Sequence, residues 1–301
     1  MTHVATLIAD PARLALDAPL LALAATALPA PGAVQWLCPG VAADIPFTPQ
    51  ADADQREIAD LGRAALGGLP VDWVVQPAAR RRKKLFVADM DSTMIGQECI
   101  DELAALVGLK PHVAAITERA MRGEIEFESA LRERVALLKG LPAAVVDQLL
   151  ATRITLTPGG RTLVATMRAN GAWTCLVSGG FTLFTQPIAK TIGFDEQRAN
   201  ILSLAADNTF AGSVGEPILG REAKLATLLE LAARQGVPLE ESLAIGDGAN
   251  DLAMIGAAGL GVAYRAKPAV AAAAHARIDY NDLTALLYVQ GYARDAFVEA
   301  D

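Results

Sequence analysis

One short stretch constrains the architecture of this chain more than any other. The apolar residues 85–88 are typical of a buried strand, and they run directly into Asp89-Met90-Asp91-Ser92-Thr93. In open α/β sheets, ligands bind at the edge where parallel strands end. We therefore expect Asp89 and Asp91 to face one crevice. There one carboxylate can attack phosphorus and its neighbour can carry protons, and both can help to hold a divalent cation.

Two other readings of this stretch are a solvated Asx turn and part of a calcium loop. The calcium loop is excluded, because no Gly and no distal Glu follow at EF-hand spacing. A second acidic cluster argues against the turn. Residues 242–245 predict another strand, and Gly246-Asp247-Gly248-Ala249-Asn250-Asp251 follows at once. Two carboxylate clusters at strand ends predict an oxygen-rich site that suits Mg²⁺ rather than zinc.

Two further elements have the composition of a phosphate site. Residues 173–177 predict a strand that ends at Ser178-Gly179-Gly180, where a hydroxyl and glycine N–H groups can bind phosphoryl oxygens. Lys224 lies at the start of a predicted helix. Taken alone, the first is an ordinary turn and the second a surface lysine.

In this order, the four elements resemble those of the haloacid-dehalogenase-like phosphotransferases, and their detail is similar to the phosphoserine phosphatases. The resemblance extends from about residue 84 to about residue 280. It implies an Mg²⁺-dependent hydrolysis of O-phospho-L-serine through an aspartyl-phosphate, the last step of serine biosynthesis. The resemblance implies that Asp89 is the nucleophile and Asp91 the general acid and base. It implies a metal site formed by Asp89, Asp91, Asp247 and Asp251. The residues that it implies for substrate binding in the core are Ser178, Gly179, Gly180, Lys224 and Asn250.

Residues 97–155 interrupt the sheet pattern with successive amphipathic helices. In the helix predicted for residues 127–139, Arg134 falls in the middle of the apolar arc, where a guanidinium requires an anionic partner. It either clamps a substrate carboxylate or is a snorkelling or internally paired arginine. The resemblance implies a helical cap with Arg134 for the substrate carboxylate, Glu98 for its amino group, and Met121, Gly123 and Phe127 as lining. Arg122 departs from the family pattern, which commonly has a second glycine there.

The chain divides into two expected domains. Residues 1–79 predict a small α+β domain, with strands at 4–8, 34–37 and 71–75 and helices at 14–28 and 54–66. The resemblance implies that this is a divergent or shortened ACT-like module. The basic run 80–84 is expected to be a solvated linker, with a nucleic-acid signal as the weaker alternative.

Residues 80–301 form the expected phosphatase domain, an α/β Rossmann-like parallel sheet core, HAD-like, with the cap inserted at about 97–155. After residue 157 the pattern alternates again between strands and helices. The elements predicted there are helices at 161–169, 181–192 and 222–235, strands at 173–177, 201–204, 242–245 and 259–263, and a hairpin-like segment at 207–217.

Composition favours a cytoplasmic enzyme. The net charge of −8 over 301 residues argues against a nucleic-acid partner, and three scattered cysteines without a CxxC pair suit a reducing compartment. The Ala/Leu-rich residues 14–30 resemble a signal segment, but Asp17 and Pro19 interrupt them, and no membrane partner is expected.

Three alternatives stay open at this point: a phosphotransferase that uses another alcohol such as homoserine, a phosphatase for another small metabolite, and an amino-acid-binding regulator with an inactive core. The sequence leaves a homodimer open, and it says nothing about regulation by serine.

Overall fold

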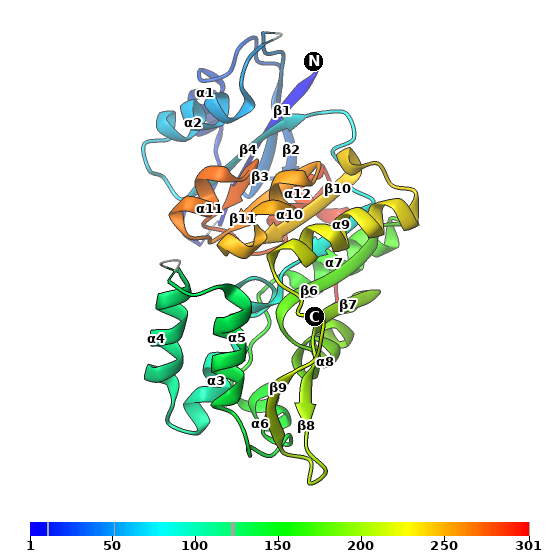
Figure 1. Cartoon of the computed structure of the whole chain (residues 1–301). Coiled ribbons are helices and arrows are strands. Elements are labelled where there is room, and N and C mark those ends of the chain that lie inside the picture. Colours follow the sequence, from blue (N-terminus) through cyan, green and yellow to red (C-terminus); the bar gives the residue numbers. More distant parts are fainter. Residues whose placement is uncertain (11, 51, 122–123, 301) are drawn as a thin grey trace.

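The computed structural model describes residues 1–10, 12–50, 52–121 and 124–300. The predicted α/β class is confirmed, since a parallel sheet covered by helices forms the core and a smaller antiparallel sheet precedes it. Figure 1 shows this N-terminal unit (residues 1–79) at one end of the core and a cap of helices at the other. A site formed by both cap and core residues must therefore lie at the end of the core that faces the cap.

The N-terminal unit has the chain order β-α-β-β-α-β, and its antiparallel sheet has the strand order β2-β3-β1-β4. Its elements are β1 (His3–Ala9), α1 (Ala18–Ala25), β2 (Gln35–Cys38), β3 (Ala42–Phe47), α2 (Gln55–Ala65) and β4 (Val71–Pro77). Each helix begins at an aspartate whose carboxylate accepts from a backbone N–H of the first turn, Asp17 from Leu20 and Asp54 from Arg56, both at 2.8 Å. Helix α1 starts later than predicted, because Pro19 belongs to its first turn, where a proline is tolerated.

Both faces of this sheet are buried. Along β4, Val71, Trp73 and Val75 pack toward α1 and α2, whereas the residues between them face the core. On that second face Val74 joins the main hydrophobic cluster of the core, and Gln76 Nε2 donates to the Val289 carbonyl at 2.6 Å. The unit thus shares a continuous interior with the core.

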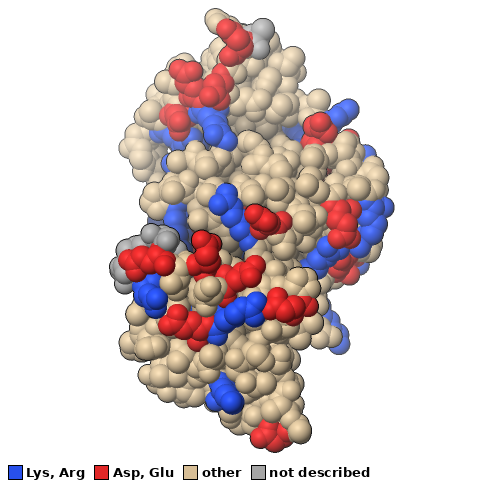
Figure 2. All heavy atoms as spheres, viewed as in Figure 1, with Lys and Arg blue, Asp and Glu red and all other residues tan. Residues whose placement is uncertain are grey.

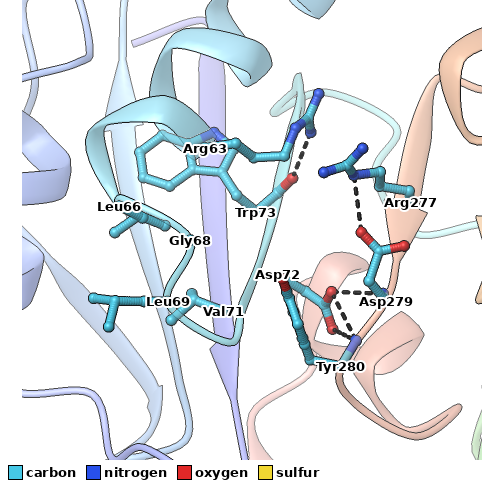
Figure 3. A pocket seen from close by; sticks show the side chains of 10 residues that line it. All are labelled: Arg63, Leu66, Gly68, Leu69, Val71, Asp72, Trp73, Arg277, Asp279 and Tyr280. Carbon is cyan, nitrogen blue, oxygen red and sulfur yellow. Dashed lines mark hydrogen bonds and ion pairs between the residues drawn. The ribbon is translucent and has the colours of Figure 1, made fainter.

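Asp72 makes the most extensive polar contact across this interface (Figure 3). Its carboxylate accepts backbone N–H bonds from Asp279 at 2.7 Å, from Tyr280 at 3.2 Å and from Asn281 at 3.0 Å. The Asn281 side chain adds a bond of 2.8 Å to Asp72 and one of 3.0 Å to the Ile8 carbonyl. Successive backbone N–H groups that converge in this way form an anion-binding concavity, and Asp72 occupies it.

The core sheet is parallel, with the strand order β12-β11-β10-β5-β6-β7. Its strands are β5 (Leu85–Ala88), β6 (Trp173–Phe181), β7 (Glu196–Asn200), β10 (Ser242–Gly246), β11 (Leu260–Tyr264) and β12 (Ala276–Ile278), and its helices are α7 (Gly160–Ala169), α8 (Thr182–Ile192), α9 (Arg221–Gln235), α10 (Leu252–Ala257), α11 (Pro268–Ala273) and α12 (Ala285–Val289). The central strand β5 is buried on both sides. Leu85 and Val87 pack with α9 and α10, and Phe86 and Ala88 pack with α7, α8 and α12.

The cap is inserted between β5 and α7 and consists of α3 (Cys99–Leu106), α4 (Lys110–Met121), α5 (Phe127–Ala136) and α6 (Val145–Thr152). A hairpin of β8 (Leu202–Leu204) and β9 (Phe210–Val214) leaves the core and lies beside α5 (Figure 1). Three backbone bonds join the hairpin to the segment after α5, from Gly140 N to the Phe210 carbonyl at 2.9 Å, from Phe210 N to the Leu141 carbonyl at 2.8 Å and from Ala143 N to the Asn208 carbonyl at 3.0 Å. Among the described residues, no helix is long and apolar enough to cross a membrane.

The basic run 80–84 is the expected solvated linker only in part, because Arg80, Arg82 and Lys84 are exposed but Arg81 and Lys83 are not. Arg81 forms an ion pair of 2.7 Å with the buried Asp44 of β3, and Lys83 is 7% exposed and donates to the Glu240 carbonyl at 2.7 Å. These residues therefore fasten the N-terminal unit to the core. Elsewhere on the surface, Figure 2 shows acidic and basic side chains intermixed on the face that it presents.

Candidate active site

The proposed nucleophile lies at the end of the central strand. Asp89 follows β5 directly, is 4% exposed, and accepts a hydrogen bond of 2.8 Å from the Met90 N–H. The next turn covers Met90–Met94, and within it Ser92 has the left-handed φ of 55°. Asp91 directly precedes Ser92 and lies close enough to Asp89 for its charge to act on the Asp89 carboxylate.

Asp91 is held by two donors from different elements. Its Oδ1 accepts from the Cys99 N–H at the start of α3 at 2.8 Å, and its Oδ2 accepts from Ser178 Oγ at the end of β6 at 3.0 Å. Burial, and then the nearby negative charge of Glu98, raise the pKa of Asp91 to about 6. A carboxyl group with that pKa can both donate and accept a proton near neutral pH.

Ser178 begins the Ser178-Gly179-Gly180 loop that was predicted to bind phosphate. The Gly180 N–H donates to Ser178 Oγ at 2.8 Å, which fixes the loop in a tight turn beside Asp91. A Cβ at Gly180 would stand 3.1 Å from the Asp91 carboxylate, so the glycine permits this close approach.

Lys224 joins the two acidic clusters. It lies in the first turns of α9, is 1% exposed, and places Nζ 2.6 Å from Asp89 Oδ1 and 2.7 Å from Asp251 Oδ1. Burial alone would lower the pKa of Lys224, but the two carboxylates outweigh burial and raise the pKa above its usual value. Lys224 is therefore a permanent cation in contact with the proposed nucleophile.

The loop after β10 completes the acidic cluster. Asp251 Oδ2 accepts from the Gly248 N–H at 3.1 Å, and Asp247 Oδ1 accepts from Thr93 Oγ1 at 3.3 Å. A Cβ at Gly246 would overlap the Asp251 carboxylate, so only glycine fits there.

The carboxylate oxygens of Asp89, Asp247 and Asp251 lie within 4.8 Å of one another. Burial, and then the charge of Asp251, raise the pKa values of both Asp89 and Asp247, the latter to about 6. A buried, like-charged set of oxygen ligands fits a divalent cation, which relieves the repulsion. Asp91, the fourth predicted ligand, directs its carboxylate to Cys99 and Ser178 instead.

Among the predicted substrate-binding residues of the cap, Phe127 and Glu98 contact residues of the site. The Phe127 ring covers the phosphate loop, since Cβ atoms at Gly179 and Gly220 would contact it at 3.4 Å and 3.2 Å. Glu98 precedes α3, and its Oε1 accepts from Ser92 Oγ at 2.6 Å. Gly123 lies outside the described residues, and of Met121 only the backbone, at the end of α4, is described.

Arg134 is half-buried in the cap and has only neutral hydrogen-bond partners among the described residues. Its Nε donates to the Ala130 carbonyl at 3.2 Å, and an amino group of its guanidinium donates to Thr117 Oγ1 at 3.4 Å. Burial lowers its pKa, whereas the charges of Asp101 and then Glu98 act against that shift. The remaining predicted residue, Asn250, folds its side chain back over Gly248 within the β10 loop.

Comparisons with known proteins agree with this geometry. Residues 86–256 match the model of the haloacid dehalogenase-like hydrolase family. The phosphoserine phosphatase of Polaromonas sp. is 46% identical over 208 residues, which cover 68% of this chain and 88% of the relative. The chain belongs to the haloacid dehalogenase-like hydrolases, within the phosphoserine phosphatase family.

Further relatives and solved structures show how much of the chain is similar to known proteins. A phosphoserine phosphatase of Streptomyces coelicolor is 44% identical over 79% of this chain, but the match covers only 58% of that relative. The chain thus spans little more than half the length of this relative. Among solved structures, a HAD family hydrolase from Salmonella enterica has a TM-score of 0.85 at 29% identity and covers 98% of this chain and 99% of its own. A phospho-aspartyl intermediate analogue of phosphoserine phosphatase has a TM-score of 0.64 at 38% identity and covers 69% of this chain and 98% of its own.

Two residues that form hydrogen bonds to the site, Thr93 and Asn200, were not predicted from the sequence. Thr93 orients Asp247, and its position beside Asp91 in the first acidic stretch was the available signal. Asn200, at the end of β7, bonds the phosphate loop, yet it lies in a polar run without a motif. Single amides of this kind become visible only when the fold brings their partners together.

Proposed function

We propose that this chain is a phosphoserine phosphatase, which hydrolyses O-phospho-L-serine to L-serine and phosphate in the last step of serine biosynthesis. The observation that carries the proposal is the buried Asp89 in contact with Lys224 at 2.6 Å, beside the Asp247 and Asp251 carboxylates. This arrangement presents a carboxylate nucleophile where a phosphoryl group meets positive charge.

The reaction proceeds in two displacements at phosphorus. In the first, an Asp89 carboxylate oxygen forms a bond to phosphorus while the bond from phosphorus to the serine oxygen breaks. Asp91 donates its proton to that departing oxygen. In the second, Asp91 takes a proton from water, the water oxygen bonds to phosphorus, and the aspartyl-phosphate breaks to release phosphate and restore Asp89. The Asp91 pKa of about 6 suits this exchange of roles.

The charge of the phosphoryl group is balanced by groups that are already in place. Lys224, Ser178 Oγ and the Gly179 N–H are proposed to bind its oxygens, together with Asn250. The Gly180 N–H, which donates to Ser178 Oγ, is proposed to exchange that bond for one to the phosphoryl group. Mg²⁺, held by Asp89, Asp247 and Asp251, supplies the further positive charge that hard oxygen ligands favour. Asp91 is proposed to transfer the proton and, as the fourth predicted metal residue, to help hold the ion, since each of its oxygens accepts one hydrogen bond and keeps a second lone pair.

The serine end of the substrate is assigned to the cap. Arg134 is proposed to bind the carboxylate, since it is a half-buried cation with no ion-pair partner among the residues that the structure describes. Glu98 is proposed to bind the ammonium group, and Phe127, Met121 and Gly123 to line the enclosed space. Two neutral hydrogen-bond acceptors compensate only weakly for the desolvation of the Arg134 guanidinium, and a substrate carboxylate would supply the missing negative charge.

We further propose two domains, residues 1–79 and 80–301, with the cap at about 97–155. The β-α-β-β-α-β order of the first is compatible with an ACT-like module. A cytoplasmic location and a small-molecule partner follow from the proposed activity, and a homodimer stays open.

The deciding experiment measures phosphate release from a panel of phospho-amino acids and sugar phosphates, with and without Mg²⁺. Preference for phosphoserine that depends on Mg²⁺ would support the proposal. Adding homoserine or another alcohol separates hydrolysis from transfer, because a transferase would form a new phosphate ester without free phosphate. Preference for another ester would reassign the substrate.

A further inference from the structure

The phosphate loop exists because the pairing of two strands is interrupted. Strands β6 and β7 pair with Val177 opposite Arg198, and they pair again with Phe181 opposite Asn200. Between these pairs β6 contributes residues 178–180, whereas β7 contributes a single residue. The extra length bulges out of the sheet toward the crevice. A bulge without ladder hydrogen bonds needs other partners to hold its shape.

Asn200 provides these partners. Its side chain is 3% exposed, and its Nδ2 donates to the Gly179 carbonyl at 2.9 Å and to the Leu219 carbonyl at 3.0 Å. Its Oδ1 accepts from the Leu219 N–H at 2.7 Å. The amide therefore uses both donor hydrogens and its acceptor on two backbone segments, and only this orientation of the amide satisfies all three contacts.

The two segments carry the two groups that hold the nucleophile and its proton carrier. The first contains Ser178, which donates to Asp91 at 3.0 Å. The second leads directly into α9, where Lys224 lies 2.6 Å from Asp89. Asn200 contacts neither Asp89 nor Asp91, but its amide connects the two segments whose side chains contact them.

We propose that Asn200 is a positioning residue of the phosphate-binding site, whose single amide holds the loop of residues 178–180 against the segment that presents Lys224. The inference rests on the proposed function, because it concerns the phosphate that this site binds. A merely structural asparagine would stabilise the fold in the same way as any other buried amide. A positioning role instead predicts a specific loss of phosphate affinity.

Asn281 offers the matched control. It is 8% exposed, and its amide likewise connects two segments, through bonds of 3.0 Å to the Ile8 carbonyl and 2.8 Å to Asp72. Those segments lie at the interface with the N-terminal unit. The probe is inorganic phosphate, and its Kd in the presence of Mg²⁺ is measured by titration calorimetry for the native chain, Asn200→Ala, Asn200→Asp and Asn281→Ala. Thermal unfolding is recorded for each.

We expect Asn200→Ala to raise the phosphate Kd by roughly tenfold, which corresponds to about 1.4 kcal/mol. Asn200→Asp keeps the shape and the bond from the Leu219 N–H, but it turns a buried carboxylate oxygen toward the Gly179 and Leu219 carbonyls, so it should raise Kd at least as much. This variant decides the matter if Asn200→Ala does not fold. Asn281→Ala should lower Tm and leave Kd unchanged.

Two results would overturn the role of Asn200 alone: native phosphate affinity in Asn200→Asp, or an equal loss of affinity in Asn281→Ala. A native chain that binds no phosphate and hydrolyses no phosphate ester would overturn the proposed function, and this role with it. The two failures are therefore distinguishable.

Discussion

Asp89 and Asp91 are separated by one residue, yet their surroundings differ in a way that divides the chemistry between them. Asp89 contacts the cation of Lys224 at 2.6 Å, whereas Asp91 accepts from a backbone N–H and a serine hydroxyl. The Lys224 cation opposes the rise in the Asp89 pKa that burial and Asp251 cause, so it favours the ionised form that attacks phosphorus. Asp91, with a pKa of about 6, can exchange its proton.

Replacing the nucleophile tests this division directly. Asp89→Asn is nearly isosteric but cannot attack phosphorus, so we expect turnover to fall by roughly a thousandfold or more. Lys224 keeps its 2.7 Å contact with Asp251, and the fold should therefore survive. Phosphate release gives the rate, circular dichroism the fold, and mass spectrometry excludes deamidation. Normal turnover by an intact Asn variant would rule out the covalent mechanism.

The pKa of Asp91 predicts opposite pH responses for the two displacements. Formation of the aspartyl-phosphate needs protonated Asp91, so its rate should fall as pH rises through about 6. Hydrolysis of the intermediate needs ionised Asp91, so its rate should fall as pH drops through about 6. Quenched-flow measurement of each step between pH 5 and 8 checks both slopes. Responses of the same sign, or slopes that persist in Asp91→Asn, would assign the proton transfer to another group.

Arg134 decides the substrate assignment. If it binds a carboxylate, Arg134→Ala should reduce kcat/KM for phosphoserine by roughly 30- to 1000-fold, or about 2–4 kcal/mol, and spare p-nitrophenyl phosphate, which has no carboxylate. Arg134→Lys should recover little, because an ammonium lacks the planar fork.

The control is Arg132→Ala. Arg132 lies on the same helix but forms an exposed ion pair with Glu216 of the core, so its loss should affect both substrates alike. If Arg134→Ala behaved in the same way as Arg132→Ala, Arg134 would be a structural residue of the cap, and the choice of phosphoserine would depend on family likeness alone.

At the scale of the element, the stability of the loop after β10 depends on how the negative charge of its carboxylates is neutralised, by protons or by a divalent ion. The folded-state pKa of Asp247 is raised from 3.8 to about 6, and that of Asp89 is raised as well. The folded state therefore binds protons more tightly than the unfolded state. Stability should consequently fall as pH rises from about 4 to about 6 when a chelator removes divalent ions.

The raised pKa values of Asp89 and Asp247 predict a pH-dependent effect of Mg²⁺ on stability. In EDTA, activity should be absent and Tm should be lower at pH 7 than at pH 5, and Mg²⁺ should raise Tm more at pH 7. Asp247→Asn should raise Tm in EDTA at pH 7 and weaken the response to Mg²⁺. Scanning fluorimetry over a pH and Mg²⁺ series measures both. Full activity in EDTA would exclude the metal site.

The elements also show how far the sequence predicts the structure. The strand ends that precede Asp89 and Asp247 were predicted correctly, because apolar runs that stop at polar loops leave a strong local signal. The strand predicted for residues 173–177 instead continues to Phe181, so residues 178–180 form a bulge within β6. Strands β3, β7 and β12 were missed. Strand β3 contains Pro46, β7 is polar and lies at the sheet edge, and β12 covers only Ala276–Ile278. Each depends on partners distant in sequence rather than on local periodicity.

The same reason limits the prediction of the site. Asp89, Asp247 and Asp251 were predicted from short motifs and Lys224 from the family resemblance, and the fold brings the four together. Contacts that cross elements, such as those of Thr93 and Asn200, were not predicted, because neither residue has a partner close to it in the sequence.

At the scale of the whole molecule, the interface between the N-terminal unit and the core has buried polar contacts that predict cooperative unfolding. Asp72→Ala would leave the N–H groups of residues 279–281 without their acceptor, and we expect a loss of about 3 kcal/mol and a Tm lower by several degrees. Calorimetry should show one transition for the native chain and a broadened or split one for the variant, with kcat/KM unchanged below the transition.

The control for this prediction is Asp207→Ala. Asp207 also accepts a backbone N–H, from Thr209 at 3.1 Å, but it does so in an exposed turn. Its loss should change Tm little. Equal effects of Asp72→Ala and Asp207→Ala would mean that the interface contributes little to stability.

The buried second face of the N-terminal sheet limits how this protein can be re-engineered. Gene fusion and truncation assume that a domain is an interchangeable part with a finished surface. Here Asp72, Gln76 and Val74 end in the interior of the neighbouring unit, and Arg81 reaches back to Asp44. A chimera that carried residues 1–79 to another enzyme would need a host surface with the same donors in the same places. On a host without such a surface, we expect the transplanted residues 1–79 to aggregate. We also expect residues 80–301 alone to be poorly soluble, so a chimera should keep the N-terminal unit and the core together.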